Sequence, residues 1–205
     1  MTRIKICGNT RAADLALAVD LKVDLVGFIL TRSKRQISLD AAAALTAQVP
    51  DHIARVGVFI DEPTAAIAEA VEHCHFSAIQ IYRPVTDADR RLGVTVVPAV
   101  RIGNGQPLPD LHFEAGDHPL LDTWASDTRG GGSGQTWKWD EAKDLARQYP
   151  IVVSGGLNPG NVADAVRQLK PWGVDVCSGV EAEPGRKDPQ KLRAFVEAVR
   201  AADRG

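Results

Sequence analysis

Short apolar runs rich in β-branched residues alternate with helical segments along nearly the whole chain, and this order limits the fold more than any other feature. The eight runs are RIKIC, DLVGFIL, ARVGVFI, SAIQI, GVTVVPAV, HPLLD, PIVVSG and GVDVCSG. Most are almost continuously apolar, which is typical of parallel strands covered by helices. Helical patterns occupy residues 11–20, 39–48, 63–73, 139–148, 159–169 and 189–202.

Repeated strand and helix order fits either a closed barrel or a doubly wound open sheet. The chain has 205 residues, 44% of them hydrophobic, which is enough for one large core. Eight units in so few residues favour the closed form. We therefore predict a single-domain (β/α)8 TIM barrel with parallel strands over residues 1–205. The stretches PVTDADRRL and RIGNGQPLPDLHFEAG, after the fourth and fifth runs, predict only short or irregular helix.

The charge balance bears on the kind of partner. A formal net charge of -2 and a pI near 6.2 argue against nucleic acid or an anionic membrane, because both require a concentrated basic surface. No apolar run reaches the roughly 18 residues of a membrane span, and the MTRIK start lacks the order of a secretory signal. We expect a cytoplasmic protein with a small-molecule ligand.

The three cysteines, Cys7, Cys74 and Cys177, are odd in number and widely spaced, which favours reduced thiols over a disulfide framework. Cys74 lies between two histidines in EHCHF. Consecutive residues of a helix point in different directions, so this pattern predicts a helix end and not a metal site.

Cys7 ends the first run, in KICGNT, and Gly8 follows it. Most free cysteines are small buried hydrophobes, and the thiol alone favours that explanation. The chemistry of a barrel lies where strands end, however, so Cys7 is expected on the active rim. Gly8 leaves space there for a ligand. A nearby cation would lower the pKa of the thiol from about 8.5 toward neutrality.

Strand alternation places Lys5 on the same side as Cys7 and turns Ile4 and Ile6 toward the helices. A lysine inside a barrel needs a partner. Asp175 lies on the eighth run, which is next to the first across the closure. We therefore predict a buried pair between Lys5 and Asp175.

Three glycine-rich turns follow the last three runs, at residues 129–137, 154–159 and 177–181. A single glycine and serine stretch is usually a flexible linker. Three such turns on consecutive units of one rim instead favour backbone N–H groups that converge on an anion. The ligand is therefore expected to carry a phosphate group.

Asp122 ends the sixth run, roughly across the barrel from the first. An aspartate in this position commonly caps a loop or a helix. Here it would approach a bound substrate from the side opposite Cys7, as a general acid facing a general base. These acid and base roles require an ionised thiol and a protonated carboxyl group. The aspartate pKa must therefore be raised above about 3.9 by poor solvation.

Seven motifs occur in order and at matching spacing: KICGNT, VGFILTRSKRQIS, RVGVFID, PLLDT, GGSGQTW, SGGLNPGNV and VDVCSGVEAEPGRKD. Through them the chain resembles the phosphoribosylanthranilate isomerase family over essentially its whole length. The resemblance implies a (β/α)8 enzyme of tryptophan biosynthesis that needs no cofactor or metal. The implied reaction is an Amadori rearrangement of N-(5-phosphoribosyl)anthranilate to 1-(2-carboxyphenylamino)-1-deoxyribulose 5-phosphate.

The resemblance also implies roles for individual residues. Asp122 would protonate the furanose ring oxygen and open the ring to a Schiff base, and the Cys7 thiolate would take the proton from C2 of the sugar. Arg35 would hold the anthranilate carboxylate, which suits the forked geometry of a guanidinium group. The implied phosphate ligands are Gly132, Ser133, Gly134, Gly155, Gly156, Ser178 and Gly179.

Two stretches depart from the family pattern. The usual Gln-Leu-His-Gly is replaced by QIYR at residues 80–83, and the usual Phe-Asp-Trp by WKW at residues 137–139. Neither change touches Cys7 or Asp122, but the first alters one wall of the cleft. Arg101, after the fifth run, would add an anion contact if it is not simply a surface residue.

Three other functions stay open at this point. One is a related aminoaldose–ketose isomerase, such as the histidine-pathway enzyme, although such enzymes resemble an aspartate pair where this chain has Cys7 and Asp122. The second is indole-3-glycerol phosphate synthase, and the third is a non-catalytic barrel that binds a phosphorylated ligand. The sequence leaves the oligomeric state open between monomer and homodimer.

Overall fold

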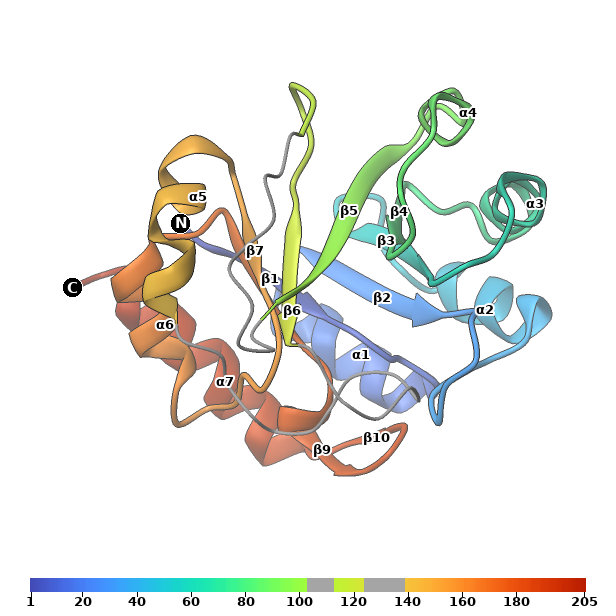
Figure 1. Ribbon diagram of the computed structural model, residues 1–205. Coiled ribbons are helices and arrows are strands. Elements are labelled where there is room, and N and C mark those ends of the chain that lie inside the picture. The colour runs from blue at the N-terminus through green and yellow to red at the C-terminus, as the bar shows by residue number, and fades with distance from the viewer. Residues whose placement is uncertain (103–112, 124–138) are drawn as a thin grey trace.

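The computed structural model describes residues 1–102, 113–123 and 139–205. Within them, eight parallel strands, one from each run, close into a barrel in the order β1 to β8 (Figure 1). The predicted (β/α)8 architecture is therefore confirmed. The strands are β1 (Arg3–Ile6), β2 (Leu25–Ile29), β3 (Ala54–Phe59), β4 (Ala78–Ile81), β5 (Thr95–Ile102), β6 (Leu120–Thr123), β7 (Val152–Val153) and β8 (Gly173–Val176).

Helices lie outside the strands, with α2, α3 and α4 on one side of the barrel and α5, α6 and α7 on the other (Figure 1). They are α1 (Ala12–Asp20), α2 (Leu39–Thr46), α3 (Thr64–Cys74), α4 (Asp87–Arg90), α5 (Lys143–Gln148), α6 (Val162–Leu169) and α7 (Pro189–Ala202). The short α4 confirms the expectation of weak helix after the fourth strand, and α3 ends at Cys74 as predicted. None of the helices in the described part of the chain has the length and apolar character that crossing a membrane requires.

Several boundaries differ from those predicted. The helix expected from residue 139 starts as a 3-10 turn, η1 (Trp139–Ala142). The helix expected from residue 159 begins only at Val162, because the Asn158 and Asn161 side chains accept bonds from nearby backbone N–H groups and form a turn. The eighth strand ends at Val176, before the 3-10 turn η2 (Ser178–Val180).

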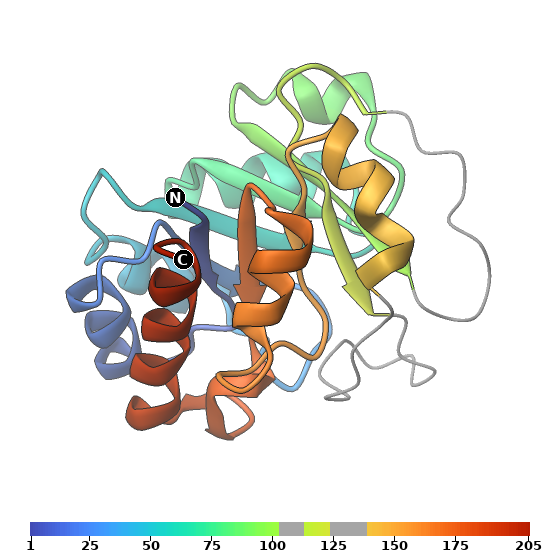
Figure 2. The ribbon, with the colours of Figure 1, turned by 90° about the vertical axis from the view of Figure 1, so that its left-hand side faces the viewer.

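A small hairpin between β8 and α7 was not predicted. Its strands are β9 (Glu181–Glu183) and β10 (Arg186–Lys187), which pair antiparallel. Figures 1 and 2 both place the two chain termini near each other. There the backbone N–H of Thr2 donates to Asp203 Oδ2 at 2.8 Å, so the first and last segments are held together.

The core has an outer and an inner part. Ile4 and Ile6 are fully buried in the large cluster between strands and helices, as strand alternation predicted. Burial of each such side chain stabilises the folded state by roughly 1.5 to 3 kcal/mol. The smaller inner clusters contain Val97, Leu120 and Val56 on the strands, with Trp172 packed against both clusters.

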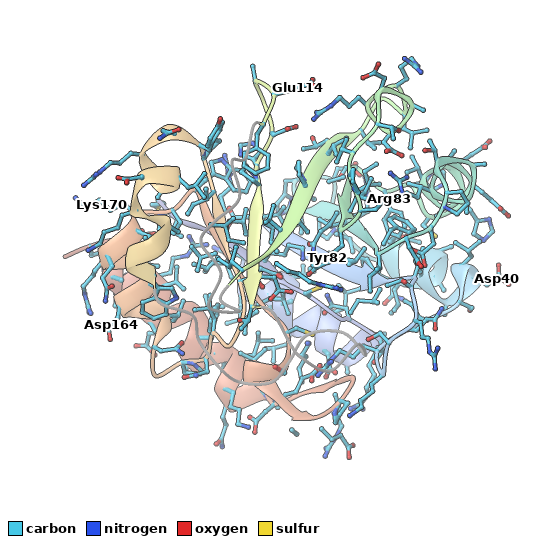
Figure 3. All side chains as sticks on the ribbon, viewed as in Figure 1. Asp40, Tyr82, Arg83, Glu114, Asp164 and Lys170 are labelled. Atoms are coloured by element: carbon cyan, nitrogen blue, oxygen red, sulfur yellow. The ribbon has the colours of Figure 1, made fainter. Side chains whose placement is uncertain are left out.

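The loop after β4 is fixed by a buried carboxylate. Asp89 is 0% exposed, and both of its oxygens accept bonds from the Arg83 guanidinium at 2.7 Å. Asp89 also accepts from Thr86 N at 2.8 Å and Thr64 Oγ1 at 2.7 Å. Arg83 therefore anchors α4, and Figure 3 shows it further out from the centre of the molecule than Tyr82.

We expect Asp89→Asn to lower the free energy of unfolding by roughly 3 kcal/mol, because it leaves the Arg83 charge without its buried partner. Arg83 holds the pKa of Asp89 well below its usual range. The ion pair therefore contributes fully above the unfolded pKa of about 3.9 and is lost as the pH falls below it. Urea titrations at several pH values measure both effects.

Asp164→Asn is the matched control. Asp164 pairs with Arg167 at 2.9 Å, but both side chains are about 60% exposed. Such exposed pairs contribute about 0 to 1 kcal/mol. Equal losses of stability in the two variants would contradict the role given to Asp89.

Candidate active site

A pocket of about 910 Å3, including its open mouth, lies inside the rim where the strands end. Its lining includes Cys7 from the end of β1 and Asp122 from β6, so the predicted base and acid share one cavity. Among its other polar residues are four that lie on or directly after β4, β7 and β8, namely Gln80, Tyr82, Ser154 and Asp175.

Lys5 lies in the barrel interior and is 3% exposed. Its Nζ donates to Asp175 Oδ1 and to Gln80 Oε1, both at 2.9 Å. The predicted pair with Asp175 is confirmed, and Gln80 is a partner that the sequence did not reveal. Burial alone would lower the pKa of Lys5, but the charges of Asp175 and Cys7 raise it above its usual value. Lys5 is therefore a permanent cation below the pocket.

Cys7 is 4% exposed and follows directly on the pairing of β1 with β8. Its backbone N–H donates to Val176 O at 2.9 Å, which makes Cys177, the residue directly after β8, its neighbour. The hydrogen bond from the Cys177 thiol and the charge of Lys5 outweigh burial and lower the pKa of Cys7 to about 7. A large fraction of Cys7 is therefore thiolate near neutral pH.

Asp122 is partly buried, and each of its oxygens accepts a hydrogen bond. The Tyr82 hydroxyl donates to Oδ2 at 2.7 Å, and the Thr123 backbone N–H donates to Oδ1 at 2.8 Å. Burial raises the pKa of Asp122 above its ordinary value, and the bond from Tyr82 opposes this shift. The pKa of the thiol is thus lowered and that of the carboxyl group raised, which are the shifts that a general base and a general acid require.

Arg35 lines the pocket, and its guanidinium is held by Glu181. Nε donates to Glu181 Oε1 and Oε2 at 2.9 and 3.0 Å, and Nη2 donates to Oε2 at 2.7 Å. Lys187 Nζ donates to Glu181 Oε1 at 3.1 Å and also to the carbonyl groups of Cys7 and Cys177 at 2.6 and 3.2 Å. Sequence reasoning missed Glu181 and Lys187, because both belong to the unpredicted hairpin.

The turn after β7 has a backbone that only glycine adopts easily. Gly155 and Gly156 have φ of 83° and 68°, and a Cβ on Gly155 would overlap Thr123. Both glycines line the pocket together with Ser178. A Cβ on Gly179 would overlap the Leu157 carbonyl oxygen, and Gly179 is not among the lining residues that the structure describes.

The remaining predicted phosphate ligands, Gly132, Ser133 and Gly134, lie outside the described residues, as does Lys138.

Tyr82 and Arg101 occupy the altered wall of the cleft. Both line the pocket, and the Arg101 guanidinium lies 5.1 Å from the centroid of the Tyr82 ring. Arg101 is also paired in register with Asp122 across β5 and β6. Alternation along β4, which puts Gln80 and Tyr82 on one face, was the available signal for these contacts.

The fold and the site define a TIM barrel whose rim, where enzymes of this fold carry their active sites, holds a thiol and a carboxyl group in one pocket beside a glycine-rich turn. Residues 4–198 match the family N-(5'phosphoribosyl)anthranilate (PRA) isomerase, so the chain belongs to this family.

Individual relatives agree with this assignment. The N-(5'-phosphoribosyl)anthranilate isomerase of Pelobacter propionicus is 36% identical over 206 residues, which cover 98% of this chain and 96% of the relative. The crystal structure of phosphoribosyl anthranilate isomerase from Thermotoga maritima is similar with a TM-score of 0.86 and 31% identity, over 98% of this chain and 100% of that one. A family structure in complex with reduced 1-(o-carboxyphenylamino)-1-deoxyribulose 5-phosphate has a TM-score of 0.82 and 29% identity, over the same shares of the two chains.

We expect the ultraviolet absorbance of the thiolate to show one step near pH 7, assigned to Cys7 by its loss in Cys7→Ser. Cys177→Ala removes the largest cause of the lowered pKa, so the step should move to higher pH. Cys74→Ala serves as the control, because burial raises the pKa of Cys74 and that thiol lies at the end of α3. A wild-type step near pH 9 would refute the assignment.

Proposed function

We propose that this chain converts N-(5'-phosphoribosyl)anthranilate into 1-(2-carboxyphenylamino)-1-deoxyribulose 5-phosphate, the Amadori rearrangement of tryptophan biosynthesis. The observation that carries the proposal is the common pocket of Cys7, with a pKa of about 7, and Asp122, with a raised pKa. Membership of the isomerase family supports the choice of substrate.

In the first step Asp122 acts as the general acid. Its proton moves to the furanose ring oxygen while the bond between C1 and that oxygen breaks. The lone pair of the anthranilate nitrogen forms the C=N bond of the Schiff base. Burial supports this role, because the raised pKa keeps the carboxyl group protonated at higher pH than an exposed aspartate.

In the second step the Cys7 thiolate removes the proton from C2. The electron pair of the broken C–H bond forms a C1=C2 bond, and the C=N electrons return to nitrogen as an enolamine. Tautomerisation then gives the ketone at C2. The charge of Lys5 supports the thiolate before the transfer. One proton leaves Asp122 and one reaches Cys7, so exchange with solvent restores both groups.

For substrate binding, we assign the phosphate to the glycine-rich side of the pocket. Gly155, Gly156 and Ser178 line it, and the family resemblance adds Gly179 and the turn at residues 132–134. Arg35 is assigned to the anthranilate carboxylate. Since Nε and Nη2 are engaged by Glu181, Arg35 would offer Nη1 and not the complete fork.

The first two proton transfers are assigned to Asp122 and Cys7, side chains of this chain, and the absence of a metal or cofactor from the reaction stays a prediction. The mechanism requires Cys7 as a free thiol beside Cys177. A reducing compartment keeps such neighbouring thiols reduced and prevents a disulfide between them, which supports the predicted cytoplasmic location.

We expect Cys7→Ser and Asp122→Asn each to lower kcat by about 10^2- to 10^4-fold with little change in KM, because each removes one proton-transfer group. The loss of anthranilate ribotide fluorescence measures both constants. Cys74→Ala is again the control. Wild-type protein that binds the ribotide without consuming it would contradict the proposal and favour the non-catalytic binding barrel.

Ser178→Ala tests the phosphate site. We expect KM to rise about tenfold with a smaller change in kcat, because a hydrogen bond to a charged group contributes about 1.5 to 3 kcal/mol. Inorganic phosphate should compete with the substrate and should inhibit the variant less strongly than the wild type. Unchanged KM and unchanged inhibition by phosphate would place the phosphate elsewhere.

A further inference from the structure

A chain of hydrogen bonds crosses the barrel interior from the cation beside Cys7 to Asp122. Lys5 Nζ donates to Gln80 Oε1 at 2.9 Å, Gln80 Nε2 donates to the Tyr82 hydroxyl at 3.2 Å, and that hydroxyl donates to Asp122 Oδ2 at 2.7 Å. The chain links β1, β4 and β6. Tyr82 is also the residue at which the sequence departs from the family pattern within the pocket, and Figure 3 shows it near the centre of the molecule.

Lys5, the first member of this series of hydrogen bonds, fixes which group donates and which accepts in each of them. A lysine ammonium group only donates hydrogen bonds, so Gln80 must turn its carbonyl oxygen toward Lys5 and its NH2 group toward Tyr82. The Tyr82 oxygen then accepts from Gln80 and directs its own hydrogen at Asp122. Gln80 is 1% exposed, so bulk water does not compete for its hydrogen bond with Lys5.

The other oxygen of the same carboxyl group is held from a different direction. The Thr123 backbone N–H donates to Asp122 Oδ1 at 2.8 Å. Rotation of the carboxyl group therefore breaks at least one of two hydrogen bonds. Without the Tyr82 hydroxyl, Asp122 would lose one of the two hydrogen bonds that hold its carboxyl group within the described part of the chain.

We propose that Tyr82 is a positioning residue for the general acid, and that its hydroxyl group holds the Asp122 carboxyl group in the orientation from which the proton reaches the substrate. This inference rests on the proposed function, because it requires Asp122 to be the acid. It adds a residue that the family resemblance does not assign.

The groups around Asp122 determine in which direction its pKa should move when the Tyr82 hydroxyl is removed. Burial and the charge of Asp175 on β8 raise the pKa of Asp122, whereas Tyr82 on the β4 side, the Thr123 backbone and Arg101 on β5 lower it. Burial and the charges of Asp122, Asp175 and Cys7 raise the pKa of Tyr82 well above its usual value, so its hydroxyl keeps its proton through the assay range. Removal of this donor therefore moves the Asp122 pKa upward.

Tyr82→Phe removes only the hydroxyl group. We expect kcat to fall about 10- to 100-fold, because the lost hydroxyl donates to the negative charge that forms on Asp122 as its proton leaves, while KM changes less than about twofold. The infrared band of the Asp122 carboxylic acid, identified by its loss in Asp122→Asn, should persist to higher pH than in the wild type. Tyr149→Phe is the matched control, since Tyr149 is the other tyrosine of the chain and packs edge-on against Phe113.

A second variant changes the bond without removing it. In the Tyr149→Phe background the one remaining tyrosine is Tyr82, so growth on fluorotyrosine labels this position alone. The more acidic phenol is a stronger donor and should move the Asp122 band to lower pH, opposite to Tyr82→Phe. This isosteric change keeps the test decisive even if Tyr82→Phe folds poorly.

An unchanged kcat and an unchanged Asp122 band in both variants would overturn the inference. A rise in KM without a fall in kcat would also overturn it, since Tyr82 would then be only a wall of the cleft. Full activity in Asp122→Asn would instead reject Asp122 as the acid and thereby the proposed mechanism itself.

Discussion

The buried ion pair between Lys5 and Asp175 is the interaction on which the pocket depends. A lysine inside a barrel is costly unless its charge is paired and hydrogen-bonded, and here Asp175 pairs the charge while Gln80 accepts a second hydrogen bond. The pair joins the first strand to the last at the closure of the barrel. It also puts a permanent positive charge beside Cys7, so one interaction contributes to both the fold and the state of the base.

The barrel interior shifts the pKa values of Cys7 and Asp122 in opposite directions. Burial disfavours the charged form of both Cys7 and Asp122, and the negative charge of Asp175 adds to this effect at each. At Cys7 the Cys177 thiol and Lys5 outweigh that cost, whereas the donors around Asp122 do not. The opposite pKa shifts that suit the proposed base and acid therefore follow from which donors lie near each group, and not from different degrees of burial.

The parts of this arrangement that follow from periodicity could be predicted from the sequence. The side-chain period of two and the adjacency of first and last strands were enough to pair Lys5 with Asp175. They could not predict the bond between Tyr82 and Asp122, because β4 and β6 are not neighbours and the contact depends on the length of a tyrosine. Arg35 and Glu181 are 146 positions apart, and their contact depends on a hairpin that had no clear sequence signal.

The contacts of Lys187 link residues from opposite ends of the sequence, and this affects when Cys7 becomes reactive during synthesis. The Lys187 ammonium group connects the carbonyl groups of Cys7 and Cys177, which directly follow β1 and β8. During synthesis Cys7 and Lys5 leave the ribosome long before Cys177 and Lys187. Until Cys177 has reached Cys7, the thiol lacks the largest cause of its lowered pKa, so the reactive thiolate arises only when the barrel closes.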